Sequence, residues 1–267
     1  MADFSPQACY QLLEKVRAEK PLVQNITNYV AMTISANVLL ALGASPAMAH
    51  AGDEQEDFSA IASSLVINIG TLSPHWIEAM KSAGSLYAKA GKPWVLDPVG
   101  VGATRYRNTT AADLLALKPT VLRGNAGEVM ALAGMAGGVK GVDSTAGSQA
   151  AIDIAKNLAT ESGIVVAVTG ETDFVTDGNS VVEITGGHAL MPLSTALGCS
   201  LSGVVGAFVA VAPPLEATIA ALSVYAAAGK LAGDKLRGPG HLPAELCDAL
   251  YGLDAATLDA NSKVRQL

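Results

Sequence analysis

Few aromatic residues and few cysteines are the first absences to note in this chain of 267 residues. Aromatic side chains make up 4% of the sequence, so the chain offers no stacking platform for the bases of a nucleic acid. The three cysteines are Cys9, Cys199 and Cys247, and they form no C-x-x-C pair. Their odd number and wide spacing indicate neither a disulfide framework nor a structural zinc site.

An excess of positive charge is also missing. The chain has 17 Lys and Arg residues against 24 Asp and Glu residues, which gives a net charge of -7 at pH 7. A surface of this sign repels nucleic acids and anionic membranes. The composition therefore predicts no nucleic acid partner.

Long apolar runs are absent too, because Ser, Gly or Pro-Pro breaks each one before it reaches the roughly 20 residues that a membrane helix needs. The N-terminal residues Met1–Pro6 have neither the basic nor the apolar region of a signal peptide. We expect no membrane partner and a cytoplasmic protein.

What the sequence has in abundance is apolar residues, at 50%, with many alanines and 27 glycines. Short β-branched runs alternate with helical patterns, which predicts a mostly parallel sheet between two helical layers. Strands are predicted at Leu22–Ile26, Leu65–Ile69, Trp94–Leu96, Thr120–Leu122 and Ile164–Val168. Helices are predicted at Asn28–Leu42, Pro74–Ala90, Thr110–Leu117, Ala126–Ala133, Ser144–Ser162, Leu201–Val211, Leu215–Leu231 and Pro243–Leu250, with a further one starting at Ser5-Pro6.

A hairpin interrupts this alternation, since Phe174–Thr176 and Val181–Ile184 flank the turn Asp177-Gly178-Asn179. No linker, repeat or low-complexity tract divides the chain, and we interpret the glycines of Gly134–Gly141 as an exposed loop. The sequence predicts one domain over residues 1–267, folded as a three-layer α/β/α sandwich.

A candidate phosphate site precedes the apolar segment Val204–Val211. A glycine turn that opens a buried helix aims unpaired N–H groups and the positive end of the helix dipole at one point. We therefore predict an anion hole at Gly198, Cys199 and Ser200. The Cys199 thiol would lie in the first helical turn, where the local field lowers a cysteine pKa from about 8.5.

A purely structural role is the alternative for this turn and its cysteine. A small-residue turn before a helix is common, and a lone cysteine is usually an inert buried hydrophobe. The segment is not a Walker A loop, because Val204 and Val205 stand where Lys and Ser or Thr are required.

Polar residues and glycines follow each predicted strand, which is where ligands bind in an open parallel sheet. They are Asn25, Gly70-Thr71, Asp97–Gly100, Arg123–Asn125 and Thr169–Glu171. We expect them to converge on one crevice together with the turn at Gly198.

Arg123 and Asp97, together with the nearby Glu128, suit a metal-bound phosphate. The forked, permanently charged guanidinium of Arg123 matches phosphate oxygens, although a surface salt bridge is the alternative. Asp97 and Glu128 could share a Mg²⁺ ion, which takes one or two protein carboxylates beside substrate oxygens. Glu128 also completes an N-x-x-E pattern with Asn125, and the alternative is a first-turn residue favoured by the helix dipole.

Six ordered blocks of the sequence resemble the hydroxyethylthiazole kinases, thiamine-salvage enzymes of the ribokinase-like superfamily. The blocks are Gln24–Asn28, Leu40–Met48, Asn68–Leu72, Leu96–Gly100, Arg123–Glu128 and Val168–Glu171. The resemblance, which extends from Pro21 to Gly240, implies a ribokinase-like fold and ATP-dependent phosphorylation of the primary alcohol of 4-methyl-5-(2-hydroxyethyl)thiazole. It also implies a Mg²⁺ cofactor and a homotrimer with active sites between subunits.

The resemblance carries residue roles with it. It implies that Asn25 and Met48 line the thiazole pocket and that Arg123 and Thr169 bind the nucleotide.

Two acidic residues and the cysteine receive roles in the same way. Glu128 would act on magnesium with help from Asp97. Cys199 would take the position where related sugar and vitamin kinases carry an aspartate base, beside the reacting hydroxyl.

One block departs from the family. The usual T-G-x-G-C reads Thr195-Ala196-Leu197-Gly198-Cys199 here, so Ala196 replaces a glycine that lets the backbone approach the substrate. Two other functions stay open at this point. One is a different vitamin or nucleoside kinase of the superfamily, and the other is a nucleotide-binding regulator that has lost catalysis.

Overall fold

The structure is a computed structural model that describes residues 4–135 and 148–267. A single sheet of nine strands runs through it, in the order β2-β1-β3-β4-β5-β6-β7-β8-β9. The strands are β1 (Leu22–Ile26), β2 (Ser45–Ala47), β3 (Ser64–Asn68), β4 (Trp94–Asp97), β5 (Val121–Asn125), β6 (Val165–Thr169), β7 (Thr172–Thr176), β8 (Val181–Thr185) and β9 (Lys263–Gln266). Strands β1 to β6 pair in parallel, and β7, β8 and β9 extend the sheet antiparallel.

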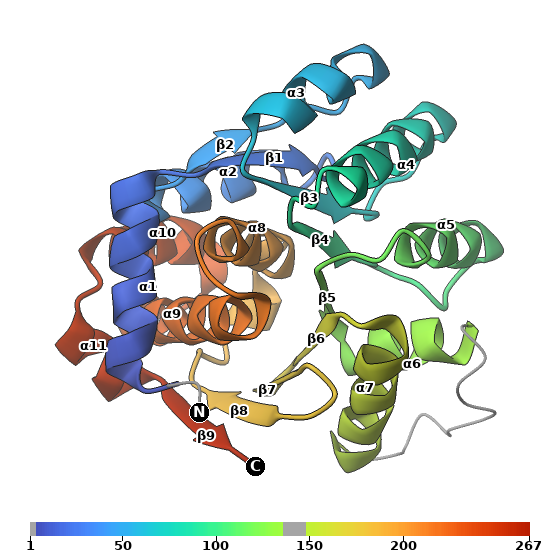
Figure 1. Cartoon of the computed structure of the whole chain (residues 1–267). Helices are drawn as coiled ribbons and strands as arrows, with labels where there is room; N and C mark the ends of the chain where they lie inside the picture. The colour runs from blue at the N-terminus through green and yellow to red at the C-terminus, as the bar shows by residue number, and fades with distance from the viewer. Residues whose placement is uncertain (1–3, 136–147) are drawn as a thin grey trace.

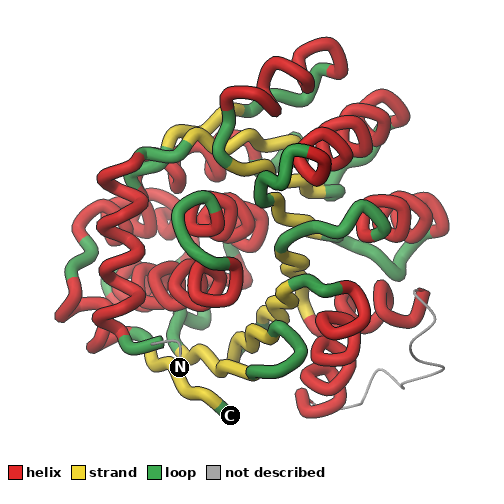
Figure 2. Tube along the Cα trace, viewed as in Figure 1, coloured by secondary structure: helices red, strands yellow, loops and turns green. Residues whose placement is uncertain are grey.

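Helices cover both faces of this sheet, as Figures 1 and 2 show. One layer holds α1 (Pro6–Glu19), α2 (Met32–Leu42), α8 (Leu197–Val209), α9 (Pro214–Asp234), α10 (Leu242–Gly252) and α11 (Ala255–Asn261). The other layer holds α3 (Gln55–Ile61), α4 (Pro74–Lys89), α5 (Arg105–Leu115), α6 (Ala126–Met135) and α7 (Ser148–Ser162). The predicted three-layer α/β/α fold is confirmed.

Two hydrophobic cores follow from the alternation of side chains along each strand. On β3, Val66 joins the core beneath α8 and α9, whereas Leu65 and Ile67 join the core beneath α4 and α5. Successive strand residues point to opposite faces, and both faces are covered, so the strand is apolar throughout. This double burial explains why the parallel strands read as continuous apolar runs.

Helix α9 is long and apolar enough in composition to cross a membrane. Within its most apolar window, 78% of the residues are buried inside the protein. Contacts with α1, α8, α10 and α11 surround it, which is the position of a core helix.

The predicted elements are largely correct, and their errors lie at the ends. Helix α2 begins at Met32 rather than at Asn28, and α8 begins at Leu197 rather than at Leu201. Helix α5 begins at Arg105 rather than at Thr110. Its N-cap is Thr104, whose side chain accepts a hydrogen bond from the N–H of Arg107.

Other differences concern strands at the edges of the sheet and short helices, and two predicted segments lie partly outside the described residues. The sequence patterns do not predict the edge strands β2 and β9 or the short helices α3 and α11. Of the predicted loop Gly134–Gly141, residues 134 and 135 belong to α6 and the rest lie outside the described residues. The first four residues of the predicted helix Ser144–Ser162 lie outside them as well.

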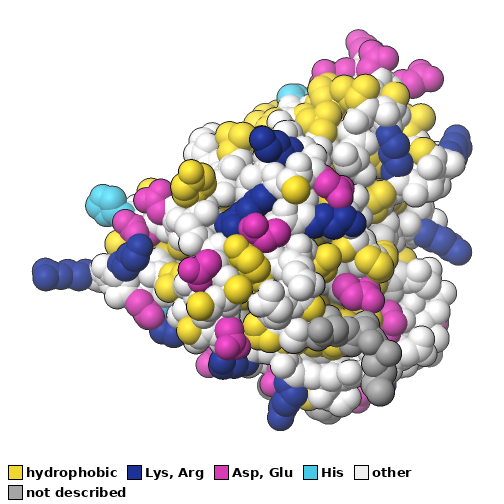
Figure 3. All heavy atoms as spheres, turned by 60° about the vertical axis from the view of Figure 1, so that its left-hand side comes forward, with side chains coloured by type: hydrophobic (Ala, Val, Ile, Leu, Met, Phe, Trp, Pro, Cys, Tyr) yellow, Lys and Arg dark blue, Asp and Glu magenta, His cyan; other side chains and the backbone are white. Residues whose placement is uncertain are grey.

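On the face shown in Figure 3, basic and acidic side chains are mixed and interspersed with apolar ones.

Candidate active site

The candidate active site lies where the carboxyl ends of the parallel strands meet the first turn of α8. Hydrogen bonds and one ion pair connect side chains from five strand ends and this helix. The connected residues are Asn28, Asn68, Asp97, Arg123, Thr169, Gly198, Cys199 and Ser202. Convergence on one point is therefore observed for the ends of β1, β3, β4, β5 and β6, although β1 and β3 contribute Asn28 and Asn68 rather than the predicted Asn25 and Gly70-Thr71.

Arg123 connects β5 to β6 and to α8. Its Nη2 atom donates to Thr169 Oγ1 at 2.6 Å, and its Nη1 atom donates to the Gly198 carbonyl at 3.2 Å. The same Nη1 atom lies 3.6 Å from Asp97 Oδ2, and the two side chains are 11% and 0% exposed. The pair is buried, so the alternative of a surface salt bridge does not hold. Removing these two charges from water costs folding free energy unless hydrogen bonds or a bound ligand compensate for the lost solvation.

Asp97 is the most deeply buried acid of the site. Its Oδ2 atom accepts hydrogen bonds from Asn68 Nδ2 at 2.7 Å and from Ser202 Oγ at 2.8 Å. Burial raises the pKa of Asp97 to about 6, although Arg123, Ser202 and Asn68 lower it. Within the described residues its second oxygen, Oδ1, is buried without a hydrogen-bond partner. Such an orphaned acceptor indicates a place for a proton, a donor or a cation.

The Cys199 thiol lies in the first turn of α8, as predicted, and it accepts a hydrogen bond from Asn28 Nδ2 at 3.3 Å. Its predicted low pKa is wrong. Burial, followed by the negative charge of Asp97, raises the pKa of Cys199 above its usual value. Hydrogen bonds from Asn28 and Asn68 lower it less than burial raises it. Burial therefore decides the direction of the shift, and the thiol keeps its proton near neutral pH.

The anion hole needs one correction, which concerns Ser200. Its N–H donates to the Ala196 carbonyl at 2.9 Å, so it is already part of the helix. Its hydroxyl donates to the Leu197 carbonyl at 2.9 Å and lies 2.7 Å from the Tyr225 hydroxyl. Ser200 thus supports the turn from inside the core and adds no free donor.

The free donors of this turn lie one residue earlier. Leu197, Gly198 and Cys199 are the first three residues of α8, and the N–H groups at these positions have no partner within a helix. A Cβ atom on Gly198 would lie 3.2 Å from Arg123 Nη1. The turn and the guanidinium are therefore close neighbours facing one site.

Ala196 immediately precedes this turn with φ 64°, in the left-handed region. Glycine adopts this conformation readily, whereas a Cβ atom makes it unfavourable by about 1–2 kcal/mol. The departure from the family pattern therefore falls on a position that favours glycine.

Glu128 connects the last residue of β5 to the first turn of α6 by hydrogen bonds. Its Oε2 atom accepts the N–H of Asn125 at 2.9 Å, while its own N–H donates to Asn125 Oδ1 at 2.9 Å. This reciprocal pair is a capping box, so the N-x-x-E pattern has a structural role. Glu128 Oε1 accepts the N–H of Gly100 at 2.9 Å, which brings the loop after β4 to the same place.

The two predicted thiazole residues each follow one member of a paired position in the sheet. Strand β1 pairs with β2 so that Gln24 is level with Ala47, and the next residues along are Asn25 and Met48. Asn25 is 2% exposed and donates to the Val23 carbonyl at 2.9 Å. Met48 is partly exposed.

Three residues of the site were missed by the sequence interpretation. Asn28 and Asn68 stand inside the resemblance blocks but received no role, and Ser202 stands inside an apolar helix. All three are nearly or fully buried. A polar residue within an otherwise apolar run is the signal that could have identified them, because buried polar groups need partners.

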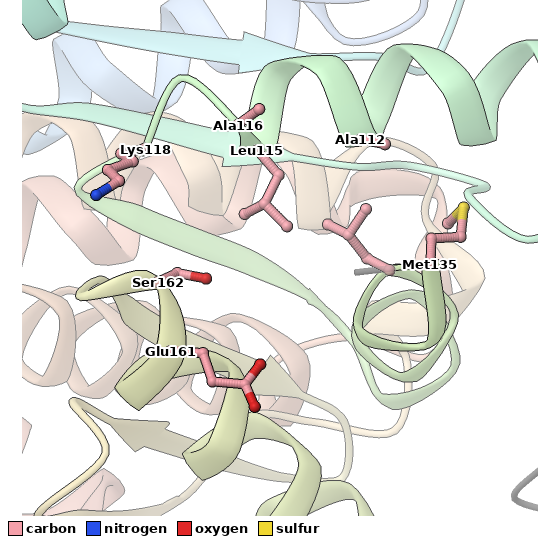
Figure 4. A pocket seen from close by; sticks show the side chains of 8 residues that line it. Ala112, Leu115, Ala116, Lys118, Met135, Glu161 and Ser162 are labelled. Carbon is pink, nitrogen blue, oxygen red and sulfur yellow. The ribbon is translucent and has the colours of Figure 1, made fainter. Parts of the chain in front are cut away.

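A separate pocket lies away from this network. A cavity of about 320 Å³ opens between α5, α6 and α7 (Figure 4). Its lining includes Lys118 and Ser162, which precede β5 and β6. The cavity is therefore at the opposite edge of the sheet from Arg123 and Cys199.

A mostly parallel sheet between two helical layers, with an arginine and a helix N-terminus at its carboxyl edge, gives this chain a ribokinase-like fold. Two solved structures share this fold at low identity. A ribokinase-like superfamily protein from Enterococcus faecalis matches with a TM-score of 0.65 at 14% identity, covering 91% of this chain and 92% of that one. The pyridoxal kinase from Staphylococcus aureus in complex with AMP-PCP matches with a TM-score of 0.62 at 17% identity, covering 92% and 99%.

Higher similarity identifies the family. The hydroxyethylthiazole kinase family model matches residues 13–256, and the chain belongs to that family. The chain is 54% identical to a hydroxyethylthiazole kinase of Cereibacter sphaeroides over 256 residues, covering 96% of this chain and 98% of that protein. The hydroxyethylthiazole kinase structure from Pyrococcus horikoshii OT3 matches with a TM-score of 0.92 at 41% identity, covering 98% and 99%.

Proposed function

We propose that this protein transfers a phosphoryl group from ATP to the primary alcohol of 4-methyl-5-(2-hydroxyethyl)thiazole, a thiamine-salvage reaction. One observation carries the proposal. Arg123, the first turn of α8 and the Cys199 thiol lie around one point at the carboxyl edge of the sheet. Family membership supports the thiazole alcohol as the acceptor.

The chemistry needs positioning more than a strong base. Phosphoryl transfer passes through a loose transition state, so charge stabilisation and alignment contribute most. In this proposal Arg123 and the N–H groups of Leu197, Gly198 and Cys199 hold the transferred phosphoryl oxygens. The neutral Cys199 thiol orients the alcohol, and the alcohol proton leaves through a phosphate oxygen.

The binding residues follow the same geometry. Thr169, which Arg123 contacts at 2.6 Å, binds the nucleotide together with that arginine. Asn25, Met48 and Ala196 surround the thiazole ring.

Two features of the described residues fit a bound Mg²⁺. Asp97 has a buried oxygen without a hydrogen-bond partner among the described residues, and the residue Glu128 is partly exposed. Glu128 and Asp97 would hold the ion mainly through water, because Mg²⁺ uses few protein ligands. No cluster of three or more His, Cys, Asp or Glu side chains suited to a metal is found in residues 4–135 and 148–267. When bound, the ion neutralises polyphosphate charge.

The proposal includes a homotrimer with active sites between subunits, located in the cytoplasm. Tyr29 and Val30, which directly follow Asn28 of the site, are 63% and 58% exposed, and Leu40 on α2 is 60% exposed. Apolar side chains exposed beside a site are typical of a surface that another chain covers.

A turnover assay tests this function. Purified protein, ATP and the thiazole alcohol are incubated with and without Mg²⁺ and followed by phosphorus NMR. A new phosphomonoester that forms only with the metal is expected. Equal ADP release with and without the alcohol indicates a different activity.

The same assay separates the alternatives. Competition among small alcohols distinguishes another vitamin or nucleoside kinase of the superfamily. ATP binding without turnover indicates a regulator, which the Ala196 departure and the cysteine in place of an aspartate motivate. Retention of Arg123, Asp97 and Glu128 argues against that regulator.

A further inference from the structure

The carboxamide of Asn28 has one possible orientation. Its Oδ1 atom accepts two backbone hydrogen bonds, from the N–H of Val30 and of Ala31, both at 3.0 Å. An amide oxygen can accept such bonds and an amide nitrogen cannot. The Nδ2 atom must therefore point away from these two backbone groups.

On that side Nδ2 meets the thiol and a second carboxamide. It donates to Cys199 Sγ at 3.3 Å and to Asn68 Oδ1 at 2.8 Å. Asn28 is 4% exposed, so water competes little for these bonds. A Cβ atom on Gly70 would lie 2.5 Å from Nδ2, and the glycine thus leaves room for the amide.

The second carboxamide is oriented in the same way. Asn68 Oδ1 also accepts the N–H of Gly70 at 2.9 Å, and Asn68 Nδ2 donates to Asp97 Oδ2 at 2.7 Å. Both amides therefore offer N–H groups toward Cys199 and Asp97. The Asn28 amide offers its nitrogen to the sulfur, so it cannot accept a proton from the thiol, and the chain of amides is no relay from Cys199 to Asp97.

We infer that Asn28 is a positioning residue for the phosphoryl transfer, holding the Cys199 sulfur by an N–H donor so that the thiol faces the acceptor alcohol. This inference rests on the proposed function. According to this inference, Asn28 affects the reaction by orienting the Cys199 thiol and not by binding the substrates. Removal of the donor should therefore lower kcat and leave KM nearly unchanged.

Asn28→Ser tests this split. The serine hydroxyl can still accept a backbone N–H of the following turn, but it is too short to reach the sulfur. Because a hydrogen bond of this kind contributes on the order of 1 kcal/mol, kcat is expected to fall about fivefold to tenfold, with both KM values within about twofold.

A double-mutant cycle shows whether the effect passes through the thiol. In a Cys199→Ala background, Asn28→Ser should change kcat by less than about twofold, because the bonded partner is gone. The matched control is Thr71→Ala, since Thr71 Oγ1 accepts the N–H of Tyr29 at 3.1 Å in the same turn without contacting the thiol. Thr71→Ala should be additive with Cys199→Ala. Additivity of Asn28→Ser with Cys199→Ala overturns the inference.

A chemical readout separates this inference from the proposed function. Asn28→Asp keeps the size and the backbone acceptor but presents an oxygen to the sulfur, which disfavours the reactive thiolate. Iodoacetamide labelling of the Cys199 peptide, measured by mass spectrometry, should slow several-fold in Asn28→Asp and not in Thr71→Ala. An unchanged labelling rate in the folded variant overturns the role of Asn28 even if the wild type proves inactive as a thiazole kinase. Wild-type inactivity with slowed labelling overturns the proposed function alone.

Discussion

At the scale of single residues, burial decides the chemistry of this site. Cys199 stands at a helix N-terminus, where the dipole favours a thiolate, yet its pKa is raised, with burial as the largest cause. Asp97 has a raised pKa for the same reason. Both groups therefore keep their protons to a higher pH than their exposed counterparts, and a reaction that depends mainly on alignment does not need the thiol to be ionised.

Removal of the thiol tests that conclusion. Cys199→Ala should lower kcat by no more than about 10²-fold, the low end for general-base assistance, and should leave measurable activity. Cys199→Asp should remain active, since a carboxylate ionises at a lower pH than the thiol and restores the base that related kinases carry. Steady-state kinetics with ATP and the alcohol measure both. Complete loss in Cys199→Ala with nucleotide binding preserved, or a trapped phosphocysteine, contradicts the secondary role of the thiol.

Ala196 gives a second prediction at this scale. Because its φ of 64° favours glycine, Ala196→Gly relieves strain of about 1–2 kcal/mol, against about 0.5–1 kcal/mol that glycine costs through the unfolded chain. We expect urea unfolding to show no loss of stability. Removal of the methyl group should also lower KM for the alcohol more than KM for ATP. An unchanged KM for the alcohol means that the loop already accommodates alanine.

At the scale of elements, the packing of α8 against the sheet determines where the first turn of this helix lies. A Cβ atom on Gly206 would lie 2.5 Å from Val66 Cγ2, and Ser64 Oγ donates to the Gly206 carbonyl at 2.7 Å. At the other end of the helix, the Tyr225 hydroxyl on α9 donates to the Leu197 carbonyl at 2.8 Å. The donors of the anion hole thus depend on packing beneath the helix.

Gly206→Ala tests the dependence of the site on this packing. The methyl group overlaps Val66, so α8 must shift, and overpacking of this kind costs about 1–3 kcal/mol of unfolding free energy. We expect kcat to fall with stability. Gly203→Ala on the same helix is the matched control, because its nearest contact would be an ordinary 3.5 Å from Leu39 Cδ1. Equal stability and activity in the two variants contradict the argument.

At the scale of the whole molecule, the buried acids connect stability to pH. An unfolded aspartate titrates near pH 3.9, whereas burial raises the pKa of Asp97 to about 6. Between these values the folded state holds a proton that the unfolded state has lost, so the contribution of Asp97 to stability falls as pH rises from about 4 to about 6.

Urea unfolding at several pH values checks this prediction. Asp97→Asn should make the dependence of the unfolding free energy on pH less negative between pH 4 and pH 6. Asp173, whose pKa burial also raises to about 6, should leave part of the slope in that variant. Identical slopes in wild type and Asp97→Asn contradict the assigned pKa.

The sequence by itself determined the parallel strands, the hairpin and most of the helices, because these depend on local periodicity and turn residues. It also placed Arg123, Asp97 and Cys199 at one edge of the sheet, since parallel strands end together. Tertiary structure alone decided the edge strands, the raised pKa of Cys199 and the replacement of Ser200 by Leu197 among the free donors. These features depend on burial and on hydrogen bonds between residues far apart in the chain, such as Asn28 to Cys199, which no local pattern records.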